Sequence, residues 1–147
     1  MSPRDFDRDV VQSRLAVMQE LLSDLSALGA ITAADLGDDR MLRHAVERIL
    51  SQLVELAVSI NGHVSATQRA RAPGGYRESF ELLADVVGLP DPLVQSLRRS
   101  VGLRNVLAHE YVRVDLGVVA DAIPAAGHDY GEYVRHVARW LSQRSQA

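Results

Sequence analysis

The sequence predicts an all-α fold, an antiparallel bundle of about five or six helices. Apolar residues recur at intervals of three and four along almost the whole chain, which is the spacing of amphipathic helices. No two segments show the alternation of apolar and polar residues that paired strands require. The 147 residues are 47% hydrophobic and 24% charged, enough for one buried core, so we expect residues 1–147 to form a single domain.

The first half of the chain carries the two longest apolar stripes. One runs from Val11 to Leu25 and predicts a helix that ends near Gly29. The other runs from Leu42 to Ile60. It follows three aspartates at positions that cap a helix amino terminus (Asp35, Asp38 and Asp39). The second stripe is wide, which predicts burial on two sides, within the bundle or against a second subunit.

The second half predicts shorter helices. The Pro73-Gly74-Gly75 sequence is the clearest break in the chain, and a helix is expected from Tyr76 to near Gly88. Pro92 fits the first turn of the next helix, whose inner face carries Leu93, Leu97 and Val101.

Two further helices are expected after residue 114. Asp115 looks like the cap of a short helix that stops before Pro124, because proline disrupts a helix interior. A last helix carries Tyr130, Val134, Val137 and Leu141 on one face.

Composition excludes several classes of protein. The chain has no cysteine, so it has no disulfide, thiolate zinc site or cysteine nucleophile. Its apolar runs are far shorter than the roughly 20 residues of a membrane span, and its amino terminus is acidic and polar, unlike a signal peptide. The aspartates lack companion histidines at ligand spacing, so we expect no metal. We therefore expect a cytoplasmic protein without a membrane partner.

The segment from Gly102 to Tyr111 carries the chemistry. Arg104 follows Val101 on the core face of its helix, so it needs a charged partner or a bound anion. Asn105 and His109 are four residues apart and can meet, so that the amide would orient the imidazole. The segment from residue 91 to 113 contains four arginines and two carboxylates, a local excess of positive charge in a chain of net charge −3.

These residue types suit metal-free cleavage of RNA. Histidine exchanges a proton near neutral pH, and arginine holds a phosphate through two parallel hydrogen bonds. In this reaction the ribose 2′-hydroxyl attacks the adjacent phosphate while a base and an acid transfer protons. One histidine per chain is few for both transfers, which favours a dimer that supplies two.

The same residues carry a family resemblance. The segment Arg104-Asn105-x-x-x-His109-x-Tyr111 resembles the R-x4-H-x-Y motif of the HepT-like toxins, members of the HEPN superfamily of small α-helical domains. The resemblance covers roughly residues 40 to 141 and includes Arg43-x-x-x-Glu47-Arg48-Ile49-Leu50, Asn61-x-His63, Pro73-x-x-Tyr76-Arg77-Glu78-x-Phe80-Glu81-Leu82-Leu83 and Val114-Asp115.

The resemblance implies a HEPN-like helical fold and a metal-independent endoribonuclease toxin that needs no cofactor and acts as a homodimer on RNA. It also implies a cognate antitoxin, a minimal nucleotidyltransferase that transfers AMP onto the motif tyrosine. Carried onto this sequence, Arg104 and His109 are catalytic and Tyr111 is the AMP acceptor. Asn105 orients His109 or touches the substrate. From their position beside the motif, independently of the resemblance, we expect Arg98 and Arg99 to bind or orient the substrate.

Other readings stay open at this point. Tyr111 could be a packing aromatic, and His63 could approach the active cleft or be a satisfied histidine near a helix end. The chain could instead be a non-catalytic helical module that docks on a nucleotidyltransferase and regulates it. A purely structural helical dimer would leave Arg104 on a core face unexplained.

Overall fold

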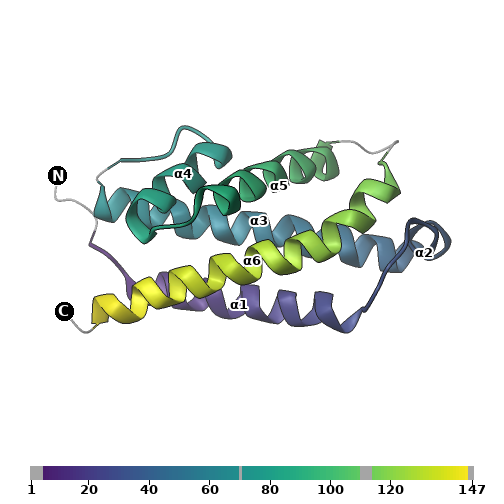
Figure 1. Cartoon of the computed structure of the whole chain (residues 1–147), viewed down its shortest axis with the longest axis horizontal. Coiled ribbons are helices and arrows are strands. Elements are labelled where there is room, and N and C mark those ends of the chain that lie inside the picture. Colours follow the sequence, from purple (N-terminus) through teal and green to yellow (C-terminus); the bar gives the residue numbers. More distant parts are fainter. Residues whose placement is uncertain (1–4, 70, 110–113, 146–147) are drawn as a thin grey trace.

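The computed structural model describes residues 5–69, 71–109 and 114–145, and within these ranges it contains helices and no strand (Figure 1). The predicted all-α class is therefore confirmed. The helices are α1 (Arg8–Ala27), α2 (Ala33–Asp38), α3 (Arg40–Gln68), α4 (Tyr76–Val87), α5 (Asp91–His109) and α6 (Leu116–Ser145).

The long helix α3 forms the centre of the bundle and contacts each of the other five helices described. In Figure 1, α1 lies on one side of it, α4 and α5 lie on the other, and α6 crosses in front. Its buried side chains include Val46, Leu53, Ala57, Ile60 and Val64. The wide apolar face is thus buried within one chain, as one of the two predicted alternatives required.

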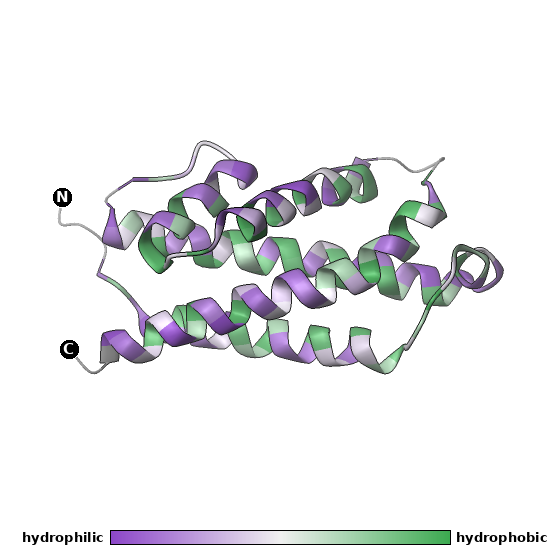
Figure 2. Ribbon diagram, in the orientation of Figure 1, coloured by the Kyte–Doolittle hydropathy of each residue, from purple (hydrophilic) through white to green (hydrophobic). Residues whose placement is uncertain are grey.

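Polar and apolar residues alternate around each long helix (Figure 2). The apolar sides converge on one core that draws on α1 to α6. None of the helices in the described ranges combines the length and the apolar character of a membrane-spanning segment.

The aspartates near residue 35 cap two helices rather than one. Asp39 accepts a hydrogen bond from Leu42 N at 3.0 Å and caps α3, as predicted. Asp35 belongs to α2, a short helix that the sequence did not predict. Its carboxylate and the Thr32 hydroxyl each accept a backbone hydrogen bond from the other residue. These bonds lower the pKa of the Asp35 carboxyl. Six residues are too few to show helical periodicity, which explains the omission.

The expected helix end before Pro124 is wrong. Helix α6 continues through this proline from Leu116 to Ser145. Pro124 is exposed, while Ile123 and Ala126 on either side of it are buried. Burial of one continuous apolar face therefore outweighs the backbone hydrogen bond that proline cannot donate.

A polar network lies inside the core and joins three helices. Tyr133 of α6 donates to Asn61 Oδ1 of α3 at 2.7 Å, and Asn61 Nδ2 donates to Ser79 Oγ of α4 at 3.0 Å. Ser79 Oγ in turn donates to the carbonyl oxygen of Tyr76 at 2.6 Å. Asn61, Ser79 and Tyr133 are fully buried, so the network satisfies polar groups that would otherwise be costly there.

Candidate active site

Helix α5 carries the motif on a segment that is anchored in the core. Leu93, Leu97 and Val101 are buried on its inner face, as predicted. Arg104 follows Val101 by three residues, so its side chain leaves the helix at the edge of this face. The helix ends at His109.

Arg104 is held on three sides. Its Nη2 forms an ion pair with Glu55 of α3, and its Nη1 donates to Asn105 Oδ1 at 3.2 Å. The guanidinium carbon lies 5.1 Å from the ring centroid of Tyr76 in α4, within cation–π range. The Arg104 side chain is 23% exposed, so it has the partner that its position on the core face requires and still reaches solvent.

Glu55 also fixes Tyr76. The Tyr76 hydroxyl donates to Glu55 Oε2 at 2.9 Å. This hydrogen bond, followed by partial burial and the charge of Glu55, raises the pKa of Tyr76, and the charge of Arg104 opposes the shift. At neutral pH Tyr76 therefore stays protonated as a donor, and residues from α3, α4 and α5 form one cluster around the guanidinium.

Asn105 and His109 do not form the predicted contact. The Asn105 amide oxygen is taken by Arg104, and no hydrogen bond joins Asn105 to His109 in the described part of the chain. His109 is exposed at the end of α5. The structure thus pairs the amide with the arginine rather than with the imidazole.

Arg104 and His109 leave α5 in different directions. Five residues of helix separate them by about 7.5 Å along the axis and about 140° around it. Arg104 turns towards α3 and α4, where Glu55 and Tyr76 hold it. One chain therefore does not bring the two side chains onto the same face.

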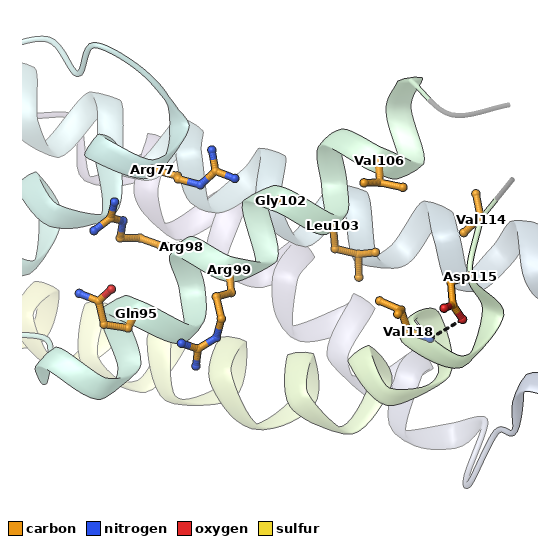
Figure 3. A pocket seen from close by; sticks show the side chains of 10 residues that line it. All are labelled: Arg77, Gln95, Arg98, Arg99, Gly102, Leu103, Val106, Val114, Asp115 and Val118. Atoms are coloured by element: carbon orange, nitrogen blue, oxygen red, sulfur yellow. Dashed lines mark hydrogen bonds between the residues drawn. The ribbon is translucent and has the colours of Figure 1, made fainter.

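Arg98 and Arg99 lie further back on α5 beside a separate groove (Figure 3). Arg98 forms an ion pair with Glu81 at 2.7 Å, and Arg99 donates to Ser96 Oγ at 3.0 Å. Neither contacts Glu55 or Asn105 in the described structure. Both side chains border the groove together with Arg77 of α4.

Tyr111 lies outside the described residues, as do Glu110 and Arg113. His63 lies against the amino-terminal segment instead of beside Arg104. Its Nε2 accepts a hydrogen bond from Asp7 N at 2.9 Å, and its ring packs 5.4 Å from that of Phe6. Of its two alternatives, the structure supports a satisfied histidine near a helix end.

In the ranges that the structure describes, no three histidine, aspartate or glutamate side chains are grouped so that they could hold a metal ion. The cluster around Arg104 contains a single carboxylate, which is already paired with the guanidinium and the Tyr76 hydroxyl. Its chemistry is that of an anion site with hydrogen-bond donors facing solvent.

Comparison with known protein families identifies the family of this chain. Residues 18–137 match the family described as "Ribonuclease HepT-like". This chain belongs to the HepT-like ribonuclease family. The predicted family resemblance is confirmed, and so is the enzyme class.

Two characterised relatives of this HepT-like ribonuclease cover most of the chain. The mRNA nuclease HepT of Shewanella oneidensis is 24% identical over 126 residues, which is 86% of this chain and 94% of the relative. The tRNA nuclease HepT of Aphanizomenon flos-aquae is 28% identical over 132 residues, 90% of each chain.

A solved structure also shares the fold. The tri-AMPylated Shewanella oneidensis HEPN toxin in complex with its MNT antitoxin aligns with a TM-score of 0.79 at 23% identity, over 89% of this chain and 98% of that one. This similarity supports the HEPN-like fold of the HepT-like ribonuclease.

Sequence reasoning missed Glu55 as the partner of Arg104. A signal was present, because Glu55 is the only carboxylate or arginine between Arg48 and Arg69. Tyr76 was expected as the first residue of its helix, and the structure adds its contacts with Glu55 and Arg104. Arg77 was part of the quoted resemblance without a role.

Proposed function

We propose that this HepT-like ribonuclease is the toxin of a toxin–antitoxin pair and cuts RNA without a metal ion or cofactor. The observation that carries the proposal is the guanidinium of Arg104, which other side chains hold in place on the motif helix while it remains open to solvent. The nuclease activities named for its two relatives support an RNA substrate.

Arg104 binds and stabilises the scissile phosphate. A guanidinium has five N–H donors in a fixed plane. Glu55 and Asn105 each engage one of its nitrogens, and the remaining donors are available for phosphate oxygens. Because the plane is already fixed, little side-chain freedom is lost when phosphate binds.

His109 transfers the protons. The ribose 2′-oxygen attacks phosphorus as it loses its proton to a base, and the bond from phosphorus to the 5′-oxygen breaks as that oxygen gains a proton from an acid. The products are a 2′,3′-cyclic phosphate and a 5′-hydroxyl. A homodimer supplies two histidines for the two transfers and places one chain's His109 near the other chain's Arg104, which a single α5 does not achieve.

Asn105, Arg98 and Arg99 contribute to substrate binding. In the described structure Asn105 Nδ2 has no hydrogen-bond acceptor, so it can donate to the substrate while the amide oxygen holds Arg104. Arg98 and Arg99 border a groove on the same helix and bind more distant phosphates.

Silencing requires a cognate nucleotidyltransferase antitoxin that transfers AMP onto Tyr111. The added phosphate and its bulk would occupy the position of the RNA backbone and repel it. The tri-AMPylated state and the antitoxin complex named for the Shewanella toxin support this. Cellular RNA as substrate places the pair in the cytoplasm. Mass spectrometry of the chain, expressed with and without the cognate nucleotidyltransferase, measures whether AMP is attached to Tyr111.

The test of the nuclease assignment compares the purified wild-type chain with His109→Ala on labelled RNA in the presence of EDTA. The wild type should cleave and leave 2′,3′-cyclic phosphate ends. Loss of a proton-transfer group should lower the rate by about 10²–10⁴-fold and abolish growth inhibition.

His128→Ala is the matched control, because His128 is also an exposed helical histidine but lies on α6. It should cleave like the wild type. Undiminished cleavage by His109→Ala would remove His109 from the mechanism. An inactive, non-toxic wild type that changes ATP turnover by the nucleotidyltransferase would instead identify a regulatory binding module.

A further inference from the structure

Arg77 stands where two surface grooves meet. One groove is bordered by Tyr76, Glu78, Arg104 and Asn105, and the Glu78 carboxylate is paired with Arg71. The other, here called the α5 groove, runs along α5 past Arg98 and Arg99 to the start of α6 (Figure 3). Arg77 lines both. A strand held at Arg104 can therefore continue into the α5 groove along the protein surface.

One half of the α5 groove is positively charged. Arg98 is neutralised by Glu81, but in the described part of the chain no carboxylate lies within ion-pair distance of Arg77 or Arg99. The carboxylate of Asp115, which also lines the groove, accepts backbone hydrogen bonds from the first turn of α6. Arg77 and Arg99 thus line the groove without an ion-pair partner in the described structure, and the lining keeps a net positive charge although the chain as a whole has a net charge of −3.

Gly102 allows Arg77 to reach across α5. A Cβ atom at position 102 would lie 3.2 Å from Arg77 Nη2, closer than such contacts normally are. Because Gly102 has no side chain, the guanidinium of Arg77 can lie close to the backbone of α5, between the two grooves.

The other half of the α5 groove is apolar. It is lined by Leu103, Val106, Val114 and Val118. Val106 is 41% and Val118 is 51% exposed, and both are among the few large hydrophobic side chains left open to solvent in the described structure. A row of guanidinium groups beside an apolar wall matches single-stranded RNA, which offers phosphates along one edge and base faces along the other.

We propose that the α5 groove binds the single-stranded RNA that flanks the scissile phosphate, with Arg77 joining it to the Arg104 site. The assignment rests on the proposed nuclease function. A second copy of the chain fits less well, because a symmetric interface over this groove would bury the arginines of both copies without carboxylate partners. An acidic protein would satisfy the arginines but would not require the groove to continue to Arg104.

The double variant Arg77→Gln/Arg99→Gln tests the proposal in the full chain without antitoxin. Its ligand is a single-stranded 2′-O-methyl RNA, which cannot be cleaved because the attacking hydroxyl is blocked. Fluorescence anisotropy should show a rise in Kd of about tenfold or more. The slope of log Kd against log salt should fall by about 1.4, since each lost phosphate contact removes about 0.7. On cleavable RNA, KM should rise and kcat should stay nearly unchanged.

Two single variants separate position from charge. Gly102→Ala keeps every charge and moves the guanidinium of Arg77 by only a few tenths of an ångström, so it should raise Kd much less than the double variant does while Tm rises, because alanine favours a helix more than glycine does. Arg139→Gln removes the same charge from an exposed site on α6 and should leave Kd nearly unchanged.

The outcomes distinguish this inference from the function on which it rests. A cleaving wild type whose double variant keeps the same Kd and salt slope would overturn the groove assignment alone. Equal losses in Arg139→Gln would overturn it too, by reducing the effect to net charge. Loss of antitoxin binding or of dimerisation, with RNA binding intact, would reassign the groove to a protein partner. A wild type that cleaves no RNA would overturn both proposals.

Discussion

Arg104 depends on side chains from two other helices for its direction. Glu55 draws one side of the guanidinium towards α3, and the Tyr76 ring supports its face from α4. The Glu55 carboxylate is also close to the position proposed for the substrate phosphate, so we expect it to repel the substrate while it aligns the arginine. These two effects act on different kinetic constants.

We therefore expect Glu55→Gln to lower kcat and KM together. Loss of the carboxylate charge removes repulsion of the phosphate and lowers KM, whereas a less firmly held Arg104 stabilises the transition state less well. A fall in kcat of about tenfold corresponds to 1.4 kcal/mol. Steady-state cleavage of a defined RNA measures both constants.

Glu47→Gln is the control for this substitution, because Glu47 lies on the same helix and pairs with Arg43 at 4.0 Å. It should change neither constant. A raised KM in Glu55→Gln would show that the carboxylate assists substrate binding, contrary to this account. Stability should hardly change in either variant, since partly exposed ion pairs contribute about 0–1 kcal/mol.

At the scale of elements, the two prolines in helices show how position decides what a residue does. Pro92 lies in the first turn of α5, where the missing N–H has no helical acceptor. Pro124 lies inside α6 and breaks one backbone hydrogen bond. Helix α6 persists because its apolar face continues across the proline.

We expect Pro124→Ala to raise the free energy of unfolding by about 1–3 kcal/mol, because alanine restores the donor to the carbonyl of residue 120 and fits the helix better. Pro124 is exposed, so little packing is lost. Urea unfolding followed by circular dichroism measures the change. Pro92→Ala should bring no comparable gain. An unchanged or less stable Pro124→Ala would mean that the proline shapes α6 for packing.

The apolar periodicity was sufficient for α1, α3, α4 and α5, because each buries one continuous stripe. It failed at α2, which is too short to show a period. The expectation that proline ends a helix failed at Pro124, because burial of the apolar face of α6 outweighs the lost hydrogen bond. For the site, the position of Arg104 predicted that a partner must exist. Its identity could not be predicted, because it depends on which turn of α3 faces α5. Arg77 was missed for the same reason, since its contact with Gly102 joins two helices.

At the scale of the whole molecule, the buried network of Tyr133, Asn61 and Ser79 locks α6, α3 and α4 together. It ends on the backbone of Tyr76, the residue whose ring supports Arg104. The core and the candidate active site therefore share one set of contacts.

Tyr133→Phe should lower the free energy of unfolding by about 1–3 kcal/mol, because it leaves the buried Asn61 oxygen without its donor. Burial raises the pKa of Tyr133 and of Tyr130 above the usual value. Their stabilising effect is therefore present below about pH 10 and is lost as the pH rises further. Denaturant titrations at several pH values should show this decline, less steeply in Tyr133→Phe.

Tyr130→Phe is the comparison for the neutral range. The Tyr130 hydroxyl shares a hydrogen bond with Ser100 Oγ at 2.6 Å, but Ser100 also bonds to the carbonyl of Leu97. Its loss should therefore destabilise less than that of the Tyr133 hydroxyl. Equal losses of stability in the two variants would contradict the expectation that an unsatisfied Asn61 oxygen makes Tyr133→Phe the more destabilising substitution.

Glu55 belongs to the first half of the chain and Arg104 to the second, with Tyr76 between them. The proposed phosphate site is consequently complete only after α5 has docked on α3 and α4. A growing polypeptide on the ribosome lacks it until nearly three quarters of its residues have been joined. For a ribonuclease, this order of synthesis keeps the site incomplete while most of the chain is being made.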